Sequence, residues 1–146
     1  MKLERGRAAG HLTAWASRLY ARLIDRRLAA IGVSSGCLPV FYALADGQAL
    51  SQKTLVEQAA IEQSTMAATL ARMVRDGLVQ RQPDPKDGRA ALFSLTPQAL
   101  AKIPAMAETG AAANAEAMEG LTPEQAEAYR ETLRTIIGNL ERVLAR

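Results

Sequence analysis

Residues 63–96, QSTMAATLARMVRDGLVQRQPDPKDGRAALFSLT, change their apolar periodicity halfway along, and this change decides the fold. The first half carries apolar residues at helical spacing and ends at Gly77, a typical helix stop. Two short runs follow, residues 78–82 and 91–95, which are typical of strands. Between them, residues 83–89 are rich in turn formers. The pattern predicts a helix followed directly by a β-hairpin, the arrangement of a wing.

A second, shorter helix is predicted immediately before this stretch. Ser51 is a suitable N-cap for residues 52–59, and the connection through Ala60 and Ile61 is tight. Two short helices joined by a tight turn are the layout of a helix-turn-helix. The predicted buried face of the second helix, residues 63–76, is formed by Met66, Leu70, Met73 and Val74.

The second helix begins with the short polar side chains that a major-groove helix needs at its leading end. These are Gln63, Ser64 and Thr65, and Thr69 follows one turn later. Such residues also cap ordinary helices, and the wing is what favours base reading over capping. Lys86 and Arg89, at the tip of the predicted hairpin, are placed to reach phosphate or the narrow minor groove.

Helices are also predicted at both ends of the chain. Residues 12–31 have helical spacing that ends at Gly32, and Pro39 suits the first turn of the next helix. Residues 122–125, Thr-Pro-Glu-Gln, form a capping box that opens a helix running to the C-terminus. Another helix starts at Thr96-Pro97 and runs toward Met118, with a kink or break expected at Pro104.

Composition excludes several classes of protein. The 146 residues are 49% hydrophobic, enough for one ordinary domain, and the net charge is +3. A single His and a single Cys provide no metal-ligand spacing and no nucleophile–base pair, and there is no glycine-rich phosphate loop. We therefore expect no enzyme, no cofactor and no metal. No apolar run reaches about 18 residues and no signal peptide is seen, so we expect a cytoplasmic protein without a membrane partner.

The order of these motifs resembles the multiple antibiotic resistance regulator (MarR) family, over roughly residues 10–146. The resemblance is carried by Leu50-Ser51-Gln52, Gln63-Ser64-Thr65, residues 72–79, residues 84–89 and Leu95-Thr96-Pro97. It implies a homodimer with helices from both chain ends at its interface and two winged lobes on successive major grooves of a palindrome. It also implies release of double-stranded DNA when a small molecule, often an aromatic acid or a phenol, binds between the dimer helices and the DNA lobe.

The expected fold is therefore mainly α with a small β-hairpin wing, a winged helix-turn-helix with N- and C-terminal dimerisation helices. We interpret residues 1–146 as a single domain. Residues 36–96 form its DNA-binding lobe, and residues 10–35 and 97–146 supply the dimerisation helices. The expected function is a sequence-specific, ligand-responsive repressor of transcription. The alternative is a winged-helix module that binds protein, although such modules often lose the basic wing tip that this chain keeps.

Layout and resemblance together give the candidate DNA contacts: Ser51, Gln52, Gln63, Ser64, Thr65, Ala68, Thr69, Arg72, Arg75, Lys86 and Arg89. By resemblance, Arg72 matches a phosphate-contacting position and Arg89 matches the wing arginine that enters the minor groove. Ala68 stands where several relatives have a base-reading Arg, and Lys86 stands where Arg is usual, so the operator sequence is not readable by analogy. Alternatively, Arg72 and Arg75 form an ordinary solvent face, and residues 84–89 form a solvated hairpin with an internal ion pair.

The candidate effector site consists of His11, Trp15 and Arg18 on one face of the first helix and Tyr42 on the next helix. Such a set would offer an aromatic wall and a cation to a carboxylate. In the alternative reading, Trp15 packs in the dimer core and the other two are surface groups. Cys37 invites comparison with relatives that sense peroxide through one cysteine, but no cation lies within sequence reach to activate the thiol. A buried, unreactive thiol is the favoured reading.

Overall fold

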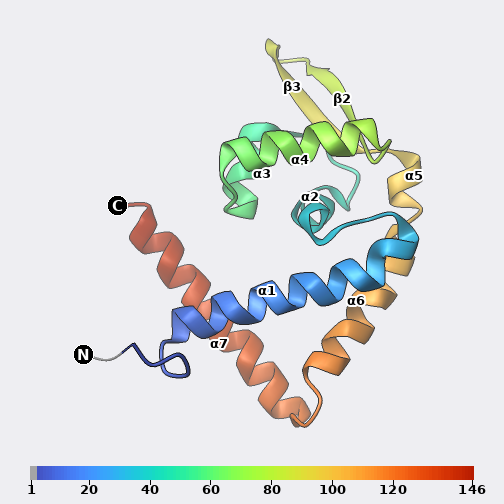
Figure 1. Ribbon diagram of the computed structural model, residues 1–146. Coiled ribbons are helices and arrows are strands. Elements are labelled where there is room, and N and C mark those ends of the chain that lie inside the picture. Colours follow the sequence, from blue (N-terminus) through green and yellow to red (C-terminus); the bar gives the residue numbers. More distant parts are fainter. Residues whose placement is uncertain (1–2) are drawn as a thin grey trace. The chain divides into compact units, whose positions relative to one another are not determined.

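The structure, a computed structural model, describes residues 3–146 and divides into two compact units, Met1–Gly110 and Ala111–Arg146 (Figure 1). The boundary lies within helix α6, Ile103–Ala117. The remaining elements of the first unit are α1 Ala9–Leu28, η1 Ala29–Ile31, η2 Ser35–Cys37, α2 Leu38–Leu44, β1 Leu50–Ser51, α3 Gln52–Ala59, α4 Gln63–Arg75, β2 Val79–Asp84, β3 Asp87–Leu95 and α5 Pro97–Leu100. This mainly helical fold with a small antiparallel sheet confirms the predicted fold class.

The sheet has the strand order β1-β3-β2, and both pairings are antiparallel. Leu50 is in register with Phe93 and Val79 with Leu95. Because β1 covers only one end of β3, the far part of the β2–β3 hairpin projects as a free wing (Figure 1). The predicted hairpin is confirmed, but its turn is shorter than residues 83–89: the strands continue to Asp84 and resume at Asp87.

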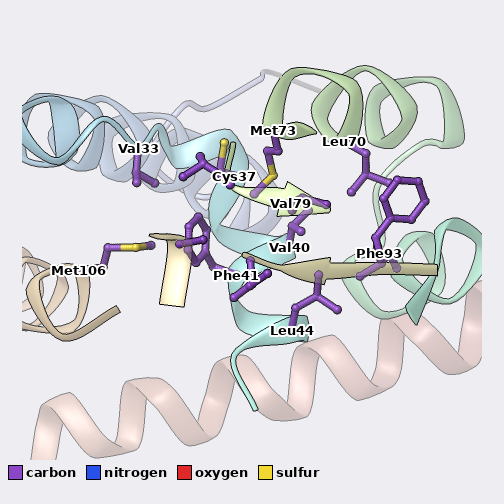
Figure 2. Packing of buried hydrophobic residues seen from close by; sticks show 14 of the residues in the cluster. Val33, Cys37, Val40, Phe41, Leu44, Leu70, Met73, Val79, Phe93 and Met106 are labelled. Carbon is purple, nitrogen blue, oxygen red and sulfur yellow. The ribbon is translucent and has the colours of Figure 1, made fainter. Parts of the chain in front are cut away.

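The hydrophobic core lies between the helices and the sheet of this unit. Figure 2 shows Val40, Phe41 and Leu44 of α2 pointing into the same cluster as Met73 of α4 and Phe93 of β3. Val40, Leu44 and Met73 have no exposed surface. Fully buried side chains of this size each stabilise the folded state by about 1.5–3 kcal/mol. The core therefore fixes α4 and the sheet against α2.

The faces of α4 differ from the prediction at two positions. Met66, Leu70 and Met73 are buried as predicted, but the fourth buried residue is Thr69, and Val74 is 41% exposed. The prediction for Val74 was wrong because the buried set follows the i, i+3, i+4, i+7 positions from Met66. Val74 is at i+8, on the edge of that face, and its apolar character does not bury it.

The predicted break near Pro104 is confirmed. The helix that opens at Thr96 ends after one turn as α5, and α6 begins at Ile103, which places Pro104 in the first turn of a new helix. A proline is tolerated there because the first-turn N–H groups have no partner inside the helix. Lys102, at the junction, donates from Nζ to the carbonyl oxygen of Ile31 over 2.6 Å.

The second unit contains α7, Pro123–Leu144. Its predicted capping box is confirmed: the Thr122 side chain accepts from the Gln125 N–H, and the Gln125 side chain accepts from the Thr122 N–H. On the surface of α7, Glu127 bonds Arg130 at 2.6 Å and Arg134 at 3.3 Å. The hydrogen bond from Arg130 and, to a smaller extent, that from Arg134 lower the pKa of the Glu127 carboxyl.

Within residues 3–146, no single helix is both long and apolar enough to cross a membrane. One pair, Ala9–Ile31 with Ser35–Leu44, meets the length and composition requirement only when the two segments are joined across a 93° bend.

Candidate nucleic-acid interface

Helices α3 and α4 form the predicted helix-turn-helix, and the start of α3 is fixed by Ser51. The Ser51 hydroxyl accepts from the Thr54 N–H at 3.2 Å and lies 3.0 Å from the Thr54 hydroxyl. Ala60 then turns the chain in the left-handed region, at φ 52°, so that α4 can begin at Gln63. Ser51 and Gln52 are half-buried at the start of α3. The Ser51 hydroxyl therefore serves the helix cap, whether or not it also contacts DNA.

The solvent face of α4 carries most of the groove-facing candidates. Gln63, Ser64, Thr65 and Ala68 are all exposed, and the face continues along the helix to Arg72 and Arg75. The prediction that Thr69 faces the groove was wrong. Its surface is only 8% exposed, because it lies on the core side of α4 with Met66 and Leu70. A side chain buried there cannot reach a base edge, so Thr69 does not belong to the candidate interface.

The two arginines of α4 point to different surroundings. Arg75 is 73% exposed, and its Nε lies 4.0 Å from Oδ1 of the adjacent Asp76. Arg72 lies toward the η2 turn: its guanidinium is 3.4 Å from the point where a Cβ on Gly36 would stand. Arg72 is thus positioned beside a backbone turn, whereas Arg75 extends from the outer face of the helix.

The wing presents its cations on a braced backbone. The Asp84 carboxylate accepts from the Lys86 N–H at 2.9 Å, and the Asp87 carboxylate accepts from the Arg89 N–H at 3.0 Å. The two aspartates therefore hold the turn through backbone groups. Within residues 3–146, neither Lys86 nor Arg89 makes an ion pair. The alternative of a hairpin closed by an internal ion pair is not what the structure shows, and both cationic side chains remain exposed.

A groove of about 640 Å³ separates α4 from the sheet, and it contains two cations that the sequence prediction missed. Its lining includes Lys53 from α3 and Arg81 from β2, together with Gln52 and Gln63. Arg81 lies two residues after the buried Val79, on the same face of β2. Strand alternation was the available sequence signal. It predicts that Arg81 faces the core, as Val79 does, and so gives no indication that the Arg81 guanidinium lines a surface groove.

Two of the four candidate effector residues, His11 and Trp15, lie together on α1. The His11 and Trp15 rings lie 6.2 Å apart, and the guanidinium of Arg5, not that of Arg18, covers Trp15 at 3.9 Å. Tyr42 is 83% exposed and lines a separate pocket of about 130 Å³. The other lining residues are Leu38, Phe41, Ala45, Ile103, Met106 and Ala107. His11, Trp15 and Arg18 are not among the residues that line the pocket at Tyr42, and the four-residue effector site stays a prediction.

Cys37 is buried, as favoured from the sequence, with 3% of its surface exposed. Its sulfur lies 3.4 Å from the Ser34 hydroxyl. In the part of the chain that the structure describes, no three His, Cys, Asp or Glu residues gather in a group able to hold a metal ion.

Comparisons with known proteins agree with this architecture. The family model described as "MarR family" matches residues 31–90. The transcriptional regulator HosA of Escherichia coli O111:H- is 32% identical over 98 residues, which are 67% of this chain and 73% of HosA. The HTH-type transcriptional repressor IacR of Pseudomonas putida is 28% identical over 130 residues, 87% of this chain and 78% of IacR.

A solved structure shares the fold over nearly the whole chain. Bordetella bronchiseptica BpsR, whose DNA binding is regulated by 6-hydroxynicotinic acid, superposes with a TM-score of 0.82 at 24% identity. The match covers 93% of this chain and 97% of BpsR. At this identity the similarity establishes the arrangement of elements.

Proposed function

This chain belongs to the MarR family of transcriptional regulators, and we propose that it is a homodimeric repressor that binds a palindromic operator and releases it when a small molecule binds. The proteins it resembles are regulators and not enzymes. In this proposal, α4 of each protomer lies in a major groove and the wing reaches the neighbouring minor groove. The contacts come from Ser51, Gln52, Gln63, Ser64, Thr65, Ala68, Arg72, Arg75, Lys86 and Arg89.

One observation carries the DNA-binding part of the proposal: the leading turn of α4 and the wing expose polar and cationic side chains, and neither wing cation makes an ion pair within residues 3–146. Ser64 and Thr65 are exposed at the leading turn, and Lys86 and Arg89 are exposed on a hairpin braced by backbone bonds. A preorganised wing loses little conformational entropy on binding. Unpaired cations also bind phosphate without first breaking an ion pair within the protein.

The homodimer is supported by the surface of α7. Apolar side chains on this helix are exposed in the single chain, among them Ile137 at 52%, Leu140 at 55% and Val143 at 57%. A stripe of this kind loses contact with water only when another surface covers it. A two-fold partner that contributes the same helix would cover it symmetrically, and a two-fold dimer matches the two half-sites of a palindrome.

The effector part of the proposal rests on the pocket beside Tyr42. Its aromatic and aliphatic lining, from α2 and α6, suits a single aromatic ring, and BpsR responds to an aromatic acid. The lining residues include no cation. Of the two expected effector classes, a phenol therefore suits the pocket lining within one chain. An aromatic acid requires a cation from outside this lining to pair with its carboxylate.

Fluorescence anisotropy tests the DNA-binding proposal with the purified protein and labelled DNA from upstream of its own gene, at two salt concentrations and with unrelated competitor DNA. We expect tight binding that resists competitor and weakens steeply as salt rises. Footprinting should then show a protected palindrome. Binding no tighter than to competitor, at this site and in a genome-wide selection of bound fragments, would contradict the proposal and favour the protein-binding module.

The effector proposal has its own measurement. Phenols and aromatic acids are titrated into the preformed protein–DNA complex, and release is followed by the fall in anisotropy. Ala107→Trp, which fills the pocket from α6, should abolish release while operator binding persists. Release that is unchanged in this variant would place the effector elsewhere.

A further inference from the structure

The middle of the outer face of α4 carries the methyl groups of Ala68 and Ala71, and Ala71 also lines the groove toward the sheet. Ser64, Ala68, Ala71 and Arg75 are exposed at spacings of four, three and four residues, opposite the buried Met66 and Met73. Residues at this spacing lie in one row along a helix. Ala68 lies between the polar leading turn and Arg75, about 6 Å along the helix axis from Ser64.

The chemistry of Ala68 restricts what it can recognise in DNA. Its side chain neither donates nor accepts a hydrogen bond, so it offers no favourable contact to the polar edges of guanine, adenine or cytosine. The one apolar group on a base edge in the major groove is the 5-methyl of thymine. A short side chain also allows the helix backbone to lie close to the bases, within reach of that methyl group.

We infer that Ala68 reads one thymine in each half-site of the operator, through contact of its methyl group with the thymine 5-methyl. The inference rests on the proposed function, because it assumes that α4 lies in the major groove. Ser64 and Thr65, one turn earlier, would read neighbouring bases through hydrogen bonds. Arg75, on the same row, would lie toward the phosphates at the far end of the contact.

The test replaces each thymine of the mapped operator, one at a time and in both half-sites together, by deoxyuridine. This exchange removes only the 5-methyl group and leaves base pairing unchanged. Burying one methyl group corresponds to about a fourfold change in affinity, so we expect roughly tenfold or more for the symmetric exchange at the contacted thymine. Exchange at thymines outside the contact should change the affinity less than twofold.

A variant assigns the effect to Ala68. The Ala68→Gly variant should bind operators with thymine or with deoxyuridine at the contacted position with equal affinity, because the protein methyl group is already missing. Ala67→Gly is the matched control: it has the same helix-propensity cost, but its side chain lines the groove toward the sheet, and the discrimination should persist. If the glycine variant does not fold, the discrimination between thymine and deoxyuridine is measured in Ala68→Ser, which keeps the Cβ.

Two results overturn the inference in different ways. Tight, competitor-resistant binding in which no thymine exchange depends on residue 68 leaves the repressor proposal intact and refutes the Ala68 contact. Absence of specific DNA binding by the unmodified protein refutes both.

Discussion

The Thr96 hydroxyl donates a 2.6 Å hydrogen bond to the carbonyl oxygen of Gly77, nineteen residues earlier in the chain. The Thr96 hydroxyl oxygen also accepts from the Ala99 N–H at 3.1 Å, as the N-cap of α5. Gly77 has φ +74°, in the left-handed region that ends α4. One side chain thus joins the end of the proposed recognition helix to the start of α5.

Loss of this hydroxyl should therefore cost more than loss of an ordinary cap. We expect Thr96→Val to lower the free energy of unfolding by about 2–3 kcal/mol, because both the cap and the bond to the half-buried Gly77 carbonyl disappear. Thr122→Val is the matched control, since Thr122 also precedes a proline but only caps its own helix. That control should cost about 1 kcal/mol. Equal losses in urea denaturation would show that the Gly77 bond contributes nothing.

Arg89→Ala should weaken operator binding by about 1–3 kcal/mol without changing the unfolding midpoint, because the side chain is exposed and unpaired within residues 3–146. Arg89→Lys tests whether operator binding needs only the positive charge at this position or also the planar shape of the guanidinium. If Arg89 inserts into the minor groove, lysine should restore only part of the affinity, since it lacks the planar fork. Full recovery in anisotropy measurements would indicate a simple phosphate contact, and no loss in the alanine variant would remove the wing from the interface.

Thr65 and Arg72 should differ in what their removal changes. Arg72→Ala should reduce affinity for all sequences about equally and lower the salt slope by about 1 for each protomer, as expected for a phosphate contact. Thr65→Val should alter the preferred sequence with the salt slope unchanged, because it removes a hydroxyl and no charge. Selection from a random library at two salt concentrations measures both properties. A changed sequence preference in Arg72→Ala would contradict its assignment to phosphate.

Local signals in the sequence were sufficient for most of the fold. The caps at Ser51, Thr96 and Thr122 are all where the sequence places them, because a cap depends on residues within one turn. The buried face of α4 shows where prediction from local signals fails, because Thr69 is buried there and the predicted Val74 is not. Hydrophobicity indicated Val74, whereas the helix geometry that starts from Met66 selects position 69.

The parts of the site that depend on tertiary structure were not predictable in the same way. Arg81 lines the groove beside α4 only because β2 packs against that helix. Similarly, Tyr42 lines a pocket with Ile103 and Met106 of α6, and no spacing rule connects these residues to it. The sequence grouped Tyr42 with His11 and Trp15 because they lie on consecutive predicted helices, and helix spacing does not predict which residues share a pocket.

If α7 forms the dimer interface, a charge on its apolar stripe should separate the protomers. We expect Leu140→Lys to weaken dimerisation by about 100-fold or more, because a two-fold interface would bury two unpaired ammonium groups. Asn139→Lys adds the same charge one residue away from the stripe and should leave the dimer intact. Sedimentation equilibrium measures both, and removal of residues 122–146 should likewise give a monomer. Since a monomer contacts only one half-site, Leu140→Lys should also reduce operator affinity steeply; a stable, DNA-binding dimer in this variant would show that another surface joins the protomers.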